Sequence, residues 1–220
     1  MQQVQRPDPA RQASTARGIT IEHAILSDMA EPAVRRATYA EYLAIDAGSE
    51  LRHEYVAGII VAMAGGTIEH VRIIGQLQFL LRLALTGKPC AVLASDARVR
   101  VRTADRAAYP DILVVCGEIE KDAEDSHAIV NPTVLIEVLS DSTAAVDREE
   151  KNHDYRRLPS LREYVLVSQR ERSIEVYRRS GPRRWTLEEL ISGERLQLSS
   201  LEVELAVDEI YRDALGTILG

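Results

Sequence analysis

Two short apolar runs, each interrupted by a single carboxylate, constrain this chain more than any other feature. The first run covers residues 109–115 and contains Asp111, and the second covers residues 132–139 and contains Glu137. Runs of Ile, Leu and Val predict buried strands, where a carboxylate without a partner costs several kcal/mol. If the two strands are neighbours, the carboxylates form the hard-oxygen site that Mg²⁺ or Mn²⁺ prefers.

A lysine further along the chain extends this pattern toward hydrolytic chemistry. Phosphodiester hydrolysis needs a positioned water, a metal that polarises the phosphoryl oxygens, and a cation that stabilises developing charge. We expect Asp111 and Glu137 to bind the metal, and Lys151 to orient the water or contact the phosphoryl group. Tyr155, one helical turn later, is expected to position Lys151. The alternatives are a surface lysine paired with Asp147 and an Asp111 that merely belongs to a turn.

The order of the predicted elements favours a single mixed α/β domain. Thr38 with Glu41 forms a capping-box pattern, and Thr67 is a suitable N-cap for a long helix. The apolar stripe of that helix consists of Val71, Ile74, Leu77, Leu81 and Leu85. Strands are expected at residues 55–63, 90–93, 97–103, 109–116, 133–139, 164–168, 173–178, 184–190 and 196–198, and further helices at residues 144–158 and 205–215. The expected fold is α/β, of the mixed α+β kind, with a twisted central sheet flanked by helices.

Composition limits the setting in which this domain works. Residues 1–30 lack a sustained period, so we expect a flexible N-terminal arm followed by one domain over residues 31–220. The sequence contains no run of about 18 apolar residues and no signal-peptide pattern, so we expect a cytoplasmic protein without membrane contact. Cys90 and Cys116 are too few for a disulfide framework, and we expect them to be core residues in a reducing cytoplasm. The sequence contains no Gly-rich phosphate cradle, which argues against a hydrolase of small phosphate esters. We expect no organic cofactor.

Arginines gather in two places although the chain is acidic. The net charge of −7 argues against a protein that coats nucleic acid, but it allows a local basic groove. Arg98, Arg100 and Arg102 alternate along one expected strand, and Arg106 follows in the same stretch. A second group lies beside Trp185 and consists of Arg178, Arg179, Arg183 and Arg184. Each group either contacts phosphates or forms the solvent-exposed side of a strand.

Taken together, these motifs resemble a known nuclease family. Pro110-Asp111 followed by Glu137 resembles the PD-(D/E)XK superfamily, in which a lysine two positions after the Glu assists catalysis; that position is Leu139 here. More narrowly, an ordered series of segments is similar to the Uma-type family of proteins assigned as restriction endonucleases, in which the lysine has moved to the following helix. The segments are residues 53–58, 69–70, 95–96, 109–111, 136–143 and 147–155.

The resemblance implies roles for further residues. Lys151 would replace the missing strand lysine, and Glu54, His70 and Asp96 would line the same cleft as the metal ligands. Because His70 lies in the first turn of a helix, where the dipole disfavours positive charge, we expect a neutral imidazole.

The resemblance also implies a restriction-endonuclease-like fold, a Mg or Mn cofactor and DNA as the substrate. Cutting both strands of a duplex would suit a homodimer. The rival interpretation is a non-catalytic, dimeric binding or scaffold protein that retains the nuclease fold, and Leu139 is the residue that favours it.

Overall fold

The computed structural model describes residues 35–63, 65–212 and 214–215 of the 220-residue chain. The expected N-terminal arm, residues 1–30, lies outside the described residues. The compact unit described below begins at Arg36. Within its described residues, no helix is both long enough and apolar enough to cross a bilayer.

Helices form where the sequence provides caps and periodic apolar residues. The helices are α1 (Tyr39–Ala47), α2 (Ile68–Ala84), α3 (Ala144–Val146), α4 (Asn152–Tyr155) and α5 (Val207–Ile210), with a 3₁₀ turn at Arg102–Ala104 and a π-helical turn at Asp147–Lys151. The predicted capping box is present at α1: the Glu41 N–H donates to the Thr38 hydroxyl at 3.2 Å, and the Thr38 N–H donates to the Glu41 carboxylate at 2.8 Å. Thr67 caps α2 in the predicted way, since its hydroxyl accepts the His70 N–H.

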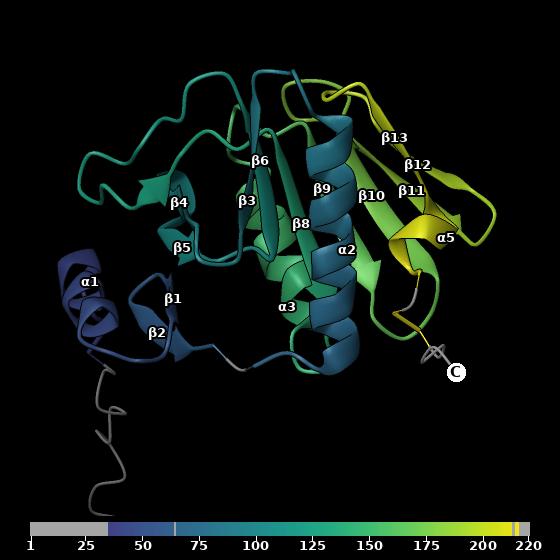
Figure 1. Ribbon diagram of the computed structural model, residues 1–220. Coiled ribbons are helices and arrows are strands. Elements are labelled where there is room, and N and C mark those ends of the chain that lie inside the picture. Colours follow the sequence, from purple (N-terminus) through teal and green to yellow (C-terminus); the bar gives the residue numbers. More distant parts are fainter. Residues whose placement is uncertain (1–34, 64, 213, 216–220) are drawn as a thin grey trace, which may run out of the picture. The chain divides into compact units, whose positions relative to one another are not determined.

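A six-stranded mixed sheet forms the centre of the fold (Figure 1). Its strands, in spatial order, are β11 (Trp185–Ile191), β10 (Ser173–Arg179), β9 (Glu163–Ser168), β8 (Val134–Leu139), β6 (Ile112–Cys116) and β3 (Cys90–Ala94). The β8–β9 pair is parallel, and the other neighbouring pairs are antiparallel. The expected twisted mixed sheet flanked by helices is therefore confirmed.

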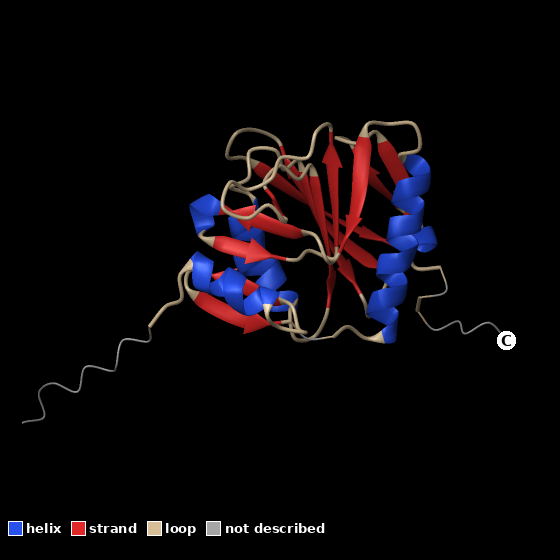
Figure 2. Ribbon diagram, turned by 60° about the vertical axis from the view of Figure 1, so that its left-hand side comes forward, coloured by secondary structure: helices blue, strands red, loops and turns tan. Residues whose placement is uncertain are grey.

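The two faces of this sheet are covered by different helices. On one face, Ile73, Leu77 and Leu81 of α2 pack against a cluster that includes Ile136 and Val138 of β8. This helix lies along the strands in Figures 1 and 2. On the opposite face, a second cluster contains Leu135 and Leu139 of β8. They pack with residues that follow β8 in the chain, including Tyr155 of α4 and Tyr164 of β9. Glu137 lies between these two leucines on β8, on the face toward the later helices.

A second sheet stands beside the first and carries one of the predicted site residues. Its strands, in spatial order, are β2 (Ile59–Ala62), β1 (His53–Val56), β5 (Arg106–Ala108), β4 (Arg98–Val101) and β7 (Ala128–Ile129), and a separate pair consists of β12 (Arg195–Leu198) and β13 (Val203–Ala206). Tyr39, Tyr42 and Tyr55 pack between α1 and the five-stranded sheet. Because β1 contains Glu54, this sheet determines where that carboxylate points.

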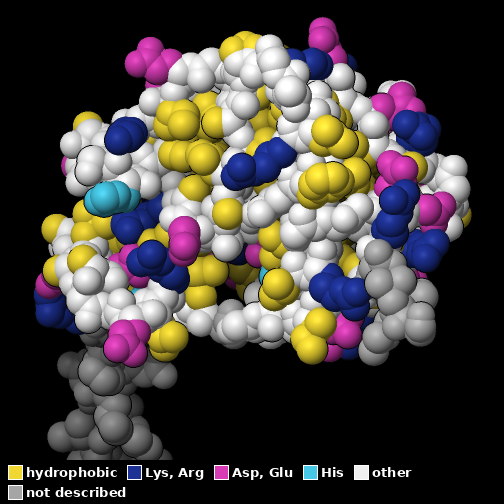
Figure 3. Space-filling model, viewed as in Figure 1, with side chains coloured by type: hydrophobic (Ala, Val, Ile, Leu, Met, Phe, Trp, Pro, Cys, Tyr) yellow, Lys and Arg dark blue, Asp and Glu magenta, His cyan; other side chains and the backbone are white. Residues whose placement is uncertain are grey.

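Three expected elements differ from the structure. The single strand expected at residues 55–63 is the β1–β2 hairpin, which turns at Ala57 and Gly58 with φ of 46° and 91°. The stripe of α2 is rotated, since Val71 is 60% exposed and Ile73 is buried. Figure 3 shows the side of the molecule on which α2 lies, and hydrophobic side chains reach the surface there. The helix expected at residues 205–215 is only α5, because Leu205 pairs with Leu196 in the β12–β13 ladder.

The two cysteines are also arranged differently from the expectation. Cys90 of β3 lies directly opposite Cys116 of β6, and their sulfur atoms form a disulfide. The interpretation as separate core thiols is therefore wrong. Antiparallel register brought together two residues that lie 26 positions apart in the sequence, and composition alone carries no information about that register.

Candidate active site

The two carboxylates that opened the sequence analysis meet where β6 and β8 pair. Ile112 pairs with Ile136, and Asp111 and Glu137 are the next residues outward from that pair. The Asp111 N–H donates to Glu137 Oε2 at 3.3 Å, and the Val138 N–H donates to Asp111 Oδ2 at 2.7 Å. The strands are neighbours, as the sequence analysis required, and their backbone amides hold both carboxylates in place.

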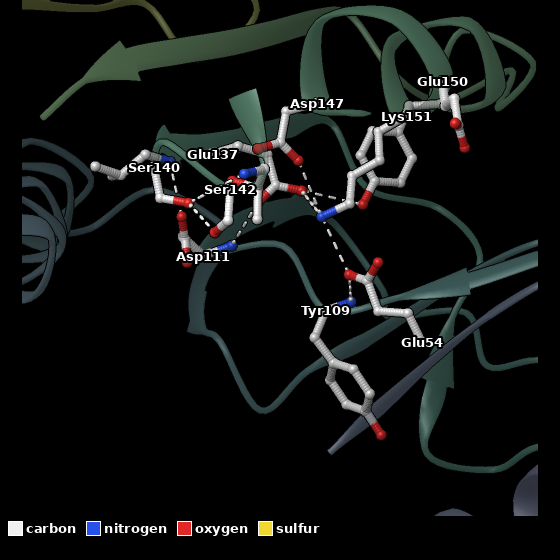
Figure 4. Close-up of polar contacts among 12 residues, drawn as sticks. Glu54, Tyr109, Asp111, Glu137, Ser140, Ser142, Asp147, Glu150 and Lys151 are labelled. Carbon is white, nitrogen blue, oxygen red and sulfur yellow. Dashed lines mark hydrogen bonds and ion pairs between the residues drawn. The ribbon is translucent and has the colours of Figure 1, made fainter. Parts of the chain in front are cut away.

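Lys151 reaches this pair from the π-helical turn. Its Nζ lies 3.2 Å from Glu137 Oε1, 3.1 Å from Glu54 Oε1 and 3.1 Å from Asp147 Oδ1. Figure 4 shows the ammonium group pointing into the space between these three acids, which come from β8, β1 and the π-helical turn. The lysine is buried, with a side chain 8% exposed, so it is not a surface lysine paired with Asp147 alone.

Hydrogen bonds from neighbouring groups fix the acids in this cluster. The Tyr155 hydroxyl donates to Glu137 Oε1 at 3.2 Å, the same oxygen that the Lys151 ammonium contacts. The Tyr109 N–H donates to Glu54 Oε1 at 3.3 Å. We call the acids Glu54, Asp111, Glu137 and Asp147, together with Lys151, the carboxylate cluster.

His70 joins the cluster from the first turn of α2. Its Nε2 lies 3.3 Å from Asp111 Oδ2, and both side chains are largely buried. Burial would lower the pKa of His70, but the hydrogen bond and the negative charge of Asp111 outweigh it and raise that pKa above its ordinary value. The helix-dipole argument for a neutral imidazole left out Asp111, which acts in the opposite direction.

The cluster carries more negative than positive charge. Burial raises the pKa of Glu137 well above its ordinary value; Lys151 opposes this, and the charges of Asp147, Asp111 and Glu54 add to it. Burial would lower the pKa of Lys151, but the charges of Glu137, Glu54 and Asp147 raise it well above its ordinary value. The lysine is therefore held as an ammonium ion, and the surplus of acids favours the binding of a further cation.

Comparisons with known proteins assign the chain to a family. Residues 39–208 match the Uma2 family, whose description is "Putative restriction endonuclease". The chain belongs to the Uma2 family. The resemblance seen in the sequence is confirmed, and the arrangement of the carboxylate cluster in this Uma2 protein is consistent with the PD-(D/E)XK superfamily.

Two relatives and one solved structure extend the comparison. The Synechocystis proteins sll1609 and slr1290, both described as uncharacterized, are 33% and 34% identical over 161 and 172 residues. These matches cover 73% and 78% of this Uma2 chain and 90% of each relative. The crystal structure titled as a "putative nuclease belonging to DUF820", from Anabaena variabilis, has a TM-score of 0.67 at 16% identity, over 80% of this chain and 98% of that one. It shows that the Uma2 protein shares that fold.

Some residues predicted for the site lie elsewhere in the Uma2 protein. The side chain of Asp96 is 83% exposed, and its carboxylate pairs with Arg52 and not with Lys151. Arg98 and Arg100 are buried, and their guanidinium groups pair with acids of the same chain; the partners are Asp46 and Asp125 for Arg98 and Asp105 for Arg100. Neither alternative considered for these two arginines holds, because a buried, paired guanidinium is neither solvated nor free to reach a phosphate. Arg102 is half-exposed and pairs with Asp122 and Glu124.

Sequence reasoning missed two contributors to the Uma2 site. The sequence places Asp147 on the same helix face as Lys151 but assigns it no role in the site; its side chain is 2% exposed and faces the same ammonium as Glu137. Its spacing of four residues from Lys151 was a usable signal. Arg106 is fully buried and holds the helix that follows the π-helical turn, through Asp154 at 2.7 Å and Glu150 at 3.1 Å. The sequence marked Arg106 only as a member of a basic group that contacts phosphate or faces solvent, and neither holds for a buried, paired guanidinium.

Proposed function

We propose that this Uma2 protein is a metal-dependent endonuclease that hydrolyses phosphodiester bonds in DNA. The observation that carries the proposal is the convergence of Asp111, Glu137 and Lys151 from two paired strands and the following helical segment. The same residue types in that order define the PD-(D/E)XK pattern that the sequence resembles. The family description and the name of the Anabaena structure support a nuclease in the broader sense.

The donor set suits a hard divalent cation such as Mg²⁺ or Mn²⁺. Asp111 and Glu137 would hold it through carboxylate oxygens, which both ions prefer. Within the described residues, no three His, Cys, Asp or Glu side chains are arranged to hold a metal together. A metal at the Asp111–Glu137 pair would therefore keep positions for water and a phosphate oxygen. When bound, such an ion polarises the phosphoryl group and lowers the pKa of water.

The surrounding side chains would do the remaining work of positioning. Lys151 is a compact point charge, and its contacts with Glu54 and Asp147 hold it beside Glu137, where it can stabilise the negative charge that develops on the phosphoryl oxygens. Tyr155 fixes the Glu137 carboxylate through its hydroxyl. His70 would orient Asp111 through the contact between its Nε2 and Asp111 Oδ2.

Nicking of supercoiled plasmid DNA tests this function. We expect the wild type to nick plasmid in Mg²⁺ or Mn²⁺ and to lose activity in EDTA. Asp111→Ala and Lys151→Ala should each reduce the rate by about 10²-fold or more, the usual effect of removing a group that stabilises transition-state charge. Glu204→Ala is the matched control, since that exposed acid belongs to β13 and pairs with Arg195. Equal activity in all four proteins would identify a contaminating nuclease and would overturn the proposal.

One observation favours a second candidate, a non-catalytic binding or scaffold protein. Lys151 already contacts three of the acids, and Tyr155 donates to Glu137, so most of the cluster is satisfied without a metal. In that case the cluster would be a structural ion-pair network. A purified wild type that binds DNA in EDTA, does not nick it with either metal and shows no metal-dependent stabilisation would support this candidate over the nuclease.

We also propose that the protein acts in the cytoplasm as a homodimer. One cluster per chain can cut one strand, so two copies related by a two-fold axis would cut both strands of a duplex. Light scattering coupled to gel filtration measures the mass directly. A monomer that nevertheless produces linear plasmid as its first product would contradict the dimer.

A further inference from the structure

A basic pocket lies on the far side of the helical segment that carries Lys151. Its volume is about 910 Å³, and it extends from α4 to the turn between β10 and β11. The arginines that line it are Arg148, Arg156, Arg157, Arg179 and Arg183, and Trp185 forms part of its wall. Glu149 is the only acidic side chain among the described residues that line it. None of the residues of the carboxylate cluster lines this pocket.

The arginines at its base are held without a compensating carboxylate. Arg179 donates to the carbonyl oxygens of Leu161, Pro182, Arg156 and Leu158 at distances between 2.7 and 3.0 Å. Burial lowers the pKa of Arg179, and the charge of Arg162 lowers it further. The guanidinium of Arg179 lies 4.5 Å from the centre of the Trp185 ring. This group is therefore rigid, oriented and only partly neutralised.

Arg156 is in a similar position. Its Nε is buried and has no hydrogen-bond partner, and its guanidinium lies over the rings of Tyr177 and Trp185. Burial lowers its pKa as well. Two guanidinium groups without a carboxylate partner thus lie against the same Trp185 ring, and an anion in the pocket would stabilise their charge.

Two further arginines are exposed at the rim. Arg157 donates to the Thr103 carbonyl oxygen at 2.7 Å, and Arg183 makes no ion pair with any described residue. A guanidinium presents several donors in a plane, which matches the oxygens of a phosphate. Arg148 is paired with Glu175, whereas the other four arginines of the pocket have no carboxylate partner among the described residues. In a chain of net charge −7, this gathering of positive charge is a specific feature and not a general property of the surface.

The pocket and the carboxylate cluster share one helical segment. Arg148, Asn152 and Arg156 are four residues apart and line the pocket, whereas Asp147 and Lys151 on the same segment point into the cluster. Because guanidinium groups already lie against the Trp185 ring, this side chain organises arginines and does not offer a free face to a base.

We propose that this basic pocket binds backbone phosphates of a DNA strand and so anchors it against the helical segment that carries Lys151. The choice of DNA rests on the proposed function, whereas the binding itself requires neither metal nor cleavage. The pocket thus gives affinity without base recognition, since phosphate contacts are independent of sequence.

Fluorescence anisotropy of labelled single-stranded and duplex oligonucleotides, in EDTA, tests the pocket apart from catalysis. We expect Arg157→Gln and Arg183→Gln each to weaken binding about threefold to tenfold and to reduce the slope of log K against log salt concentration by about 0.7 to 0.9, the contribution of one phosphate contact. Both side chains are exposed, so the variants should fold. Arg82→Gln, an exposed arginine on α2, is the matched control and should leave the affinity and the slope unchanged.

Two further arms separate the possible outcomes. Asp111→Ala should bind DNA in EDTA with the affinity of the wild type. If the protein proves to have no nuclease activity but the two pocket variants still weaken DNA binding, the proposed function fails and the pocket proposal stands. Inorganic phosphate, compared with chloride at equal ionic strength, should compete only weakly with a strand that makes several contacts. Affinity and slope unchanged in both pocket variants would overturn the proposal, and so would phosphate displacing the strand at concentrations near that of the protein.

Discussion

Lys151 is the residue on which the electrostatics of the carboxylate cluster depend. Its ammonium group lies within 3.2 Å of three carboxylates, which come from three separate elements of the fold. Replacing all members of a buried ion-pair network by apolar residues often changes stability little. Removing one member is different, because it leaves the charges of the others buried without a counterion. Lys151 is therefore needed for folding as well as for any chemistry at the site.

Replacement of this lysine should show that dependence. We expect Lys151→Met to lower the free energy of unfolding by about 3–5 kcal/mol, because Glu54, Glu137 and Asp147 then lie buried without a counterion. Urea unfolding followed by circular dichroism measures the change. Arg212→Met is the control, since both Arg212 and its partner Glu209 are exposed and such pairs contribute about 1 kcal/mol or less. Equal losses in the two variants would contradict this account of the cluster.

Asp46 controls a different property, the response to acid. Burial would raise its pKa, but the Tyr109 hydroxyl, the His53 N–H and the Arg98 guanidinium outweigh burial and lower that pKa below its ordinary value. A carboxylate with a lowered pKa in the folded state contributes stability that is complete above its unfolded pKa of about 3.9, and the contribution is lost as the pH falls through the folded pKa.

The variant Asp46→Asn should remove this acid sensitivity. We expect it to be less stable than the wild type at pH 7 and to lose less stability on acidification below about pH 4. Urea unfolding midpoints at several pH values provide the test. A variant whose stability falls with acid as steeply as that of the wild type would show that Asp46 does not carry this dependence.

At the scale of single elements, the π-helical turn decides where Lys151 points. The carbonyl oxygen of Asp147 accepts the N–H of Asn152, five residues on, and also the hydroxyl of Tyr164 at 3.1 Å. Tyr164 belongs to β9, so this strand anchors the wide turn from the sheet. Such turns are rare and often occur at functional sites.

Loss of this anchor should be measurable. We expect Tyr164→Phe to lower the free energy of unfolding by about 1 kcal/mol, the usual net contribution of one buried hydrogen bond. Tyr177→Phe is the control, because that hydroxyl makes only a long contact of 3.4 Å with Glu175 near the surface. If the control variant is as unstable as Tyr164→Phe, the hydroxyl of Tyr164 is not a specific anchor.

The sequence predicted the positions of most helices and strands, and the Asp111–Glu137 pair, better than it predicted which side chains are buried. Asp111, Glu137 and Lys151 were identifiable because each broke a pattern: two carboxylates in apolar runs, and a lysine that replaced the one missing at Leu139. The interpretation of Arg98 and Arg100 was wrong because alternation along a strand distinguishes two faces but does not show that both are buried, as they are in β4. Their acidic partners come from α1 and from loops, which local patterns do not connect.

At the scale of the whole molecule, the surplus of acids in the cluster links metal binding to stability. A ligand that binds only the folded state stabilises it by about 2.7 kcal/mol at 100 times its Kd. For a protein of this size, that corresponds to a rise in Tm of about 5–10 °C. We expect Mg²⁺ to raise the Tm beyond the effect of KCl at equal ionic strength.

The same experiment has a matched pair of variants. Asp111→Asn should abolish the metal-dependent rise, whereas Glu204→Gln should retain it, because the exposed Glu204 belongs to β13 and pairs with Arg195. Differential scanning fluorimetry records all three proteins. A rise of equal size in Asp111→Asn would place the binding of the metal somewhere other than the Asp111–Glu137 pair.

The disulfide between Cys90 and Cys116 has a consequence for how the molecule behaves in concentrated solution. It ties β3, an outermost strand of the six-stranded sheet, to β6. An outermost strand exposes unpaired backbone groups, and if it detaches, the strand beneath it becomes a template for self-association. Thiol reductants would break this disulfide, and we therefore expect the protein to precipitate before the rest of the domain unfolds.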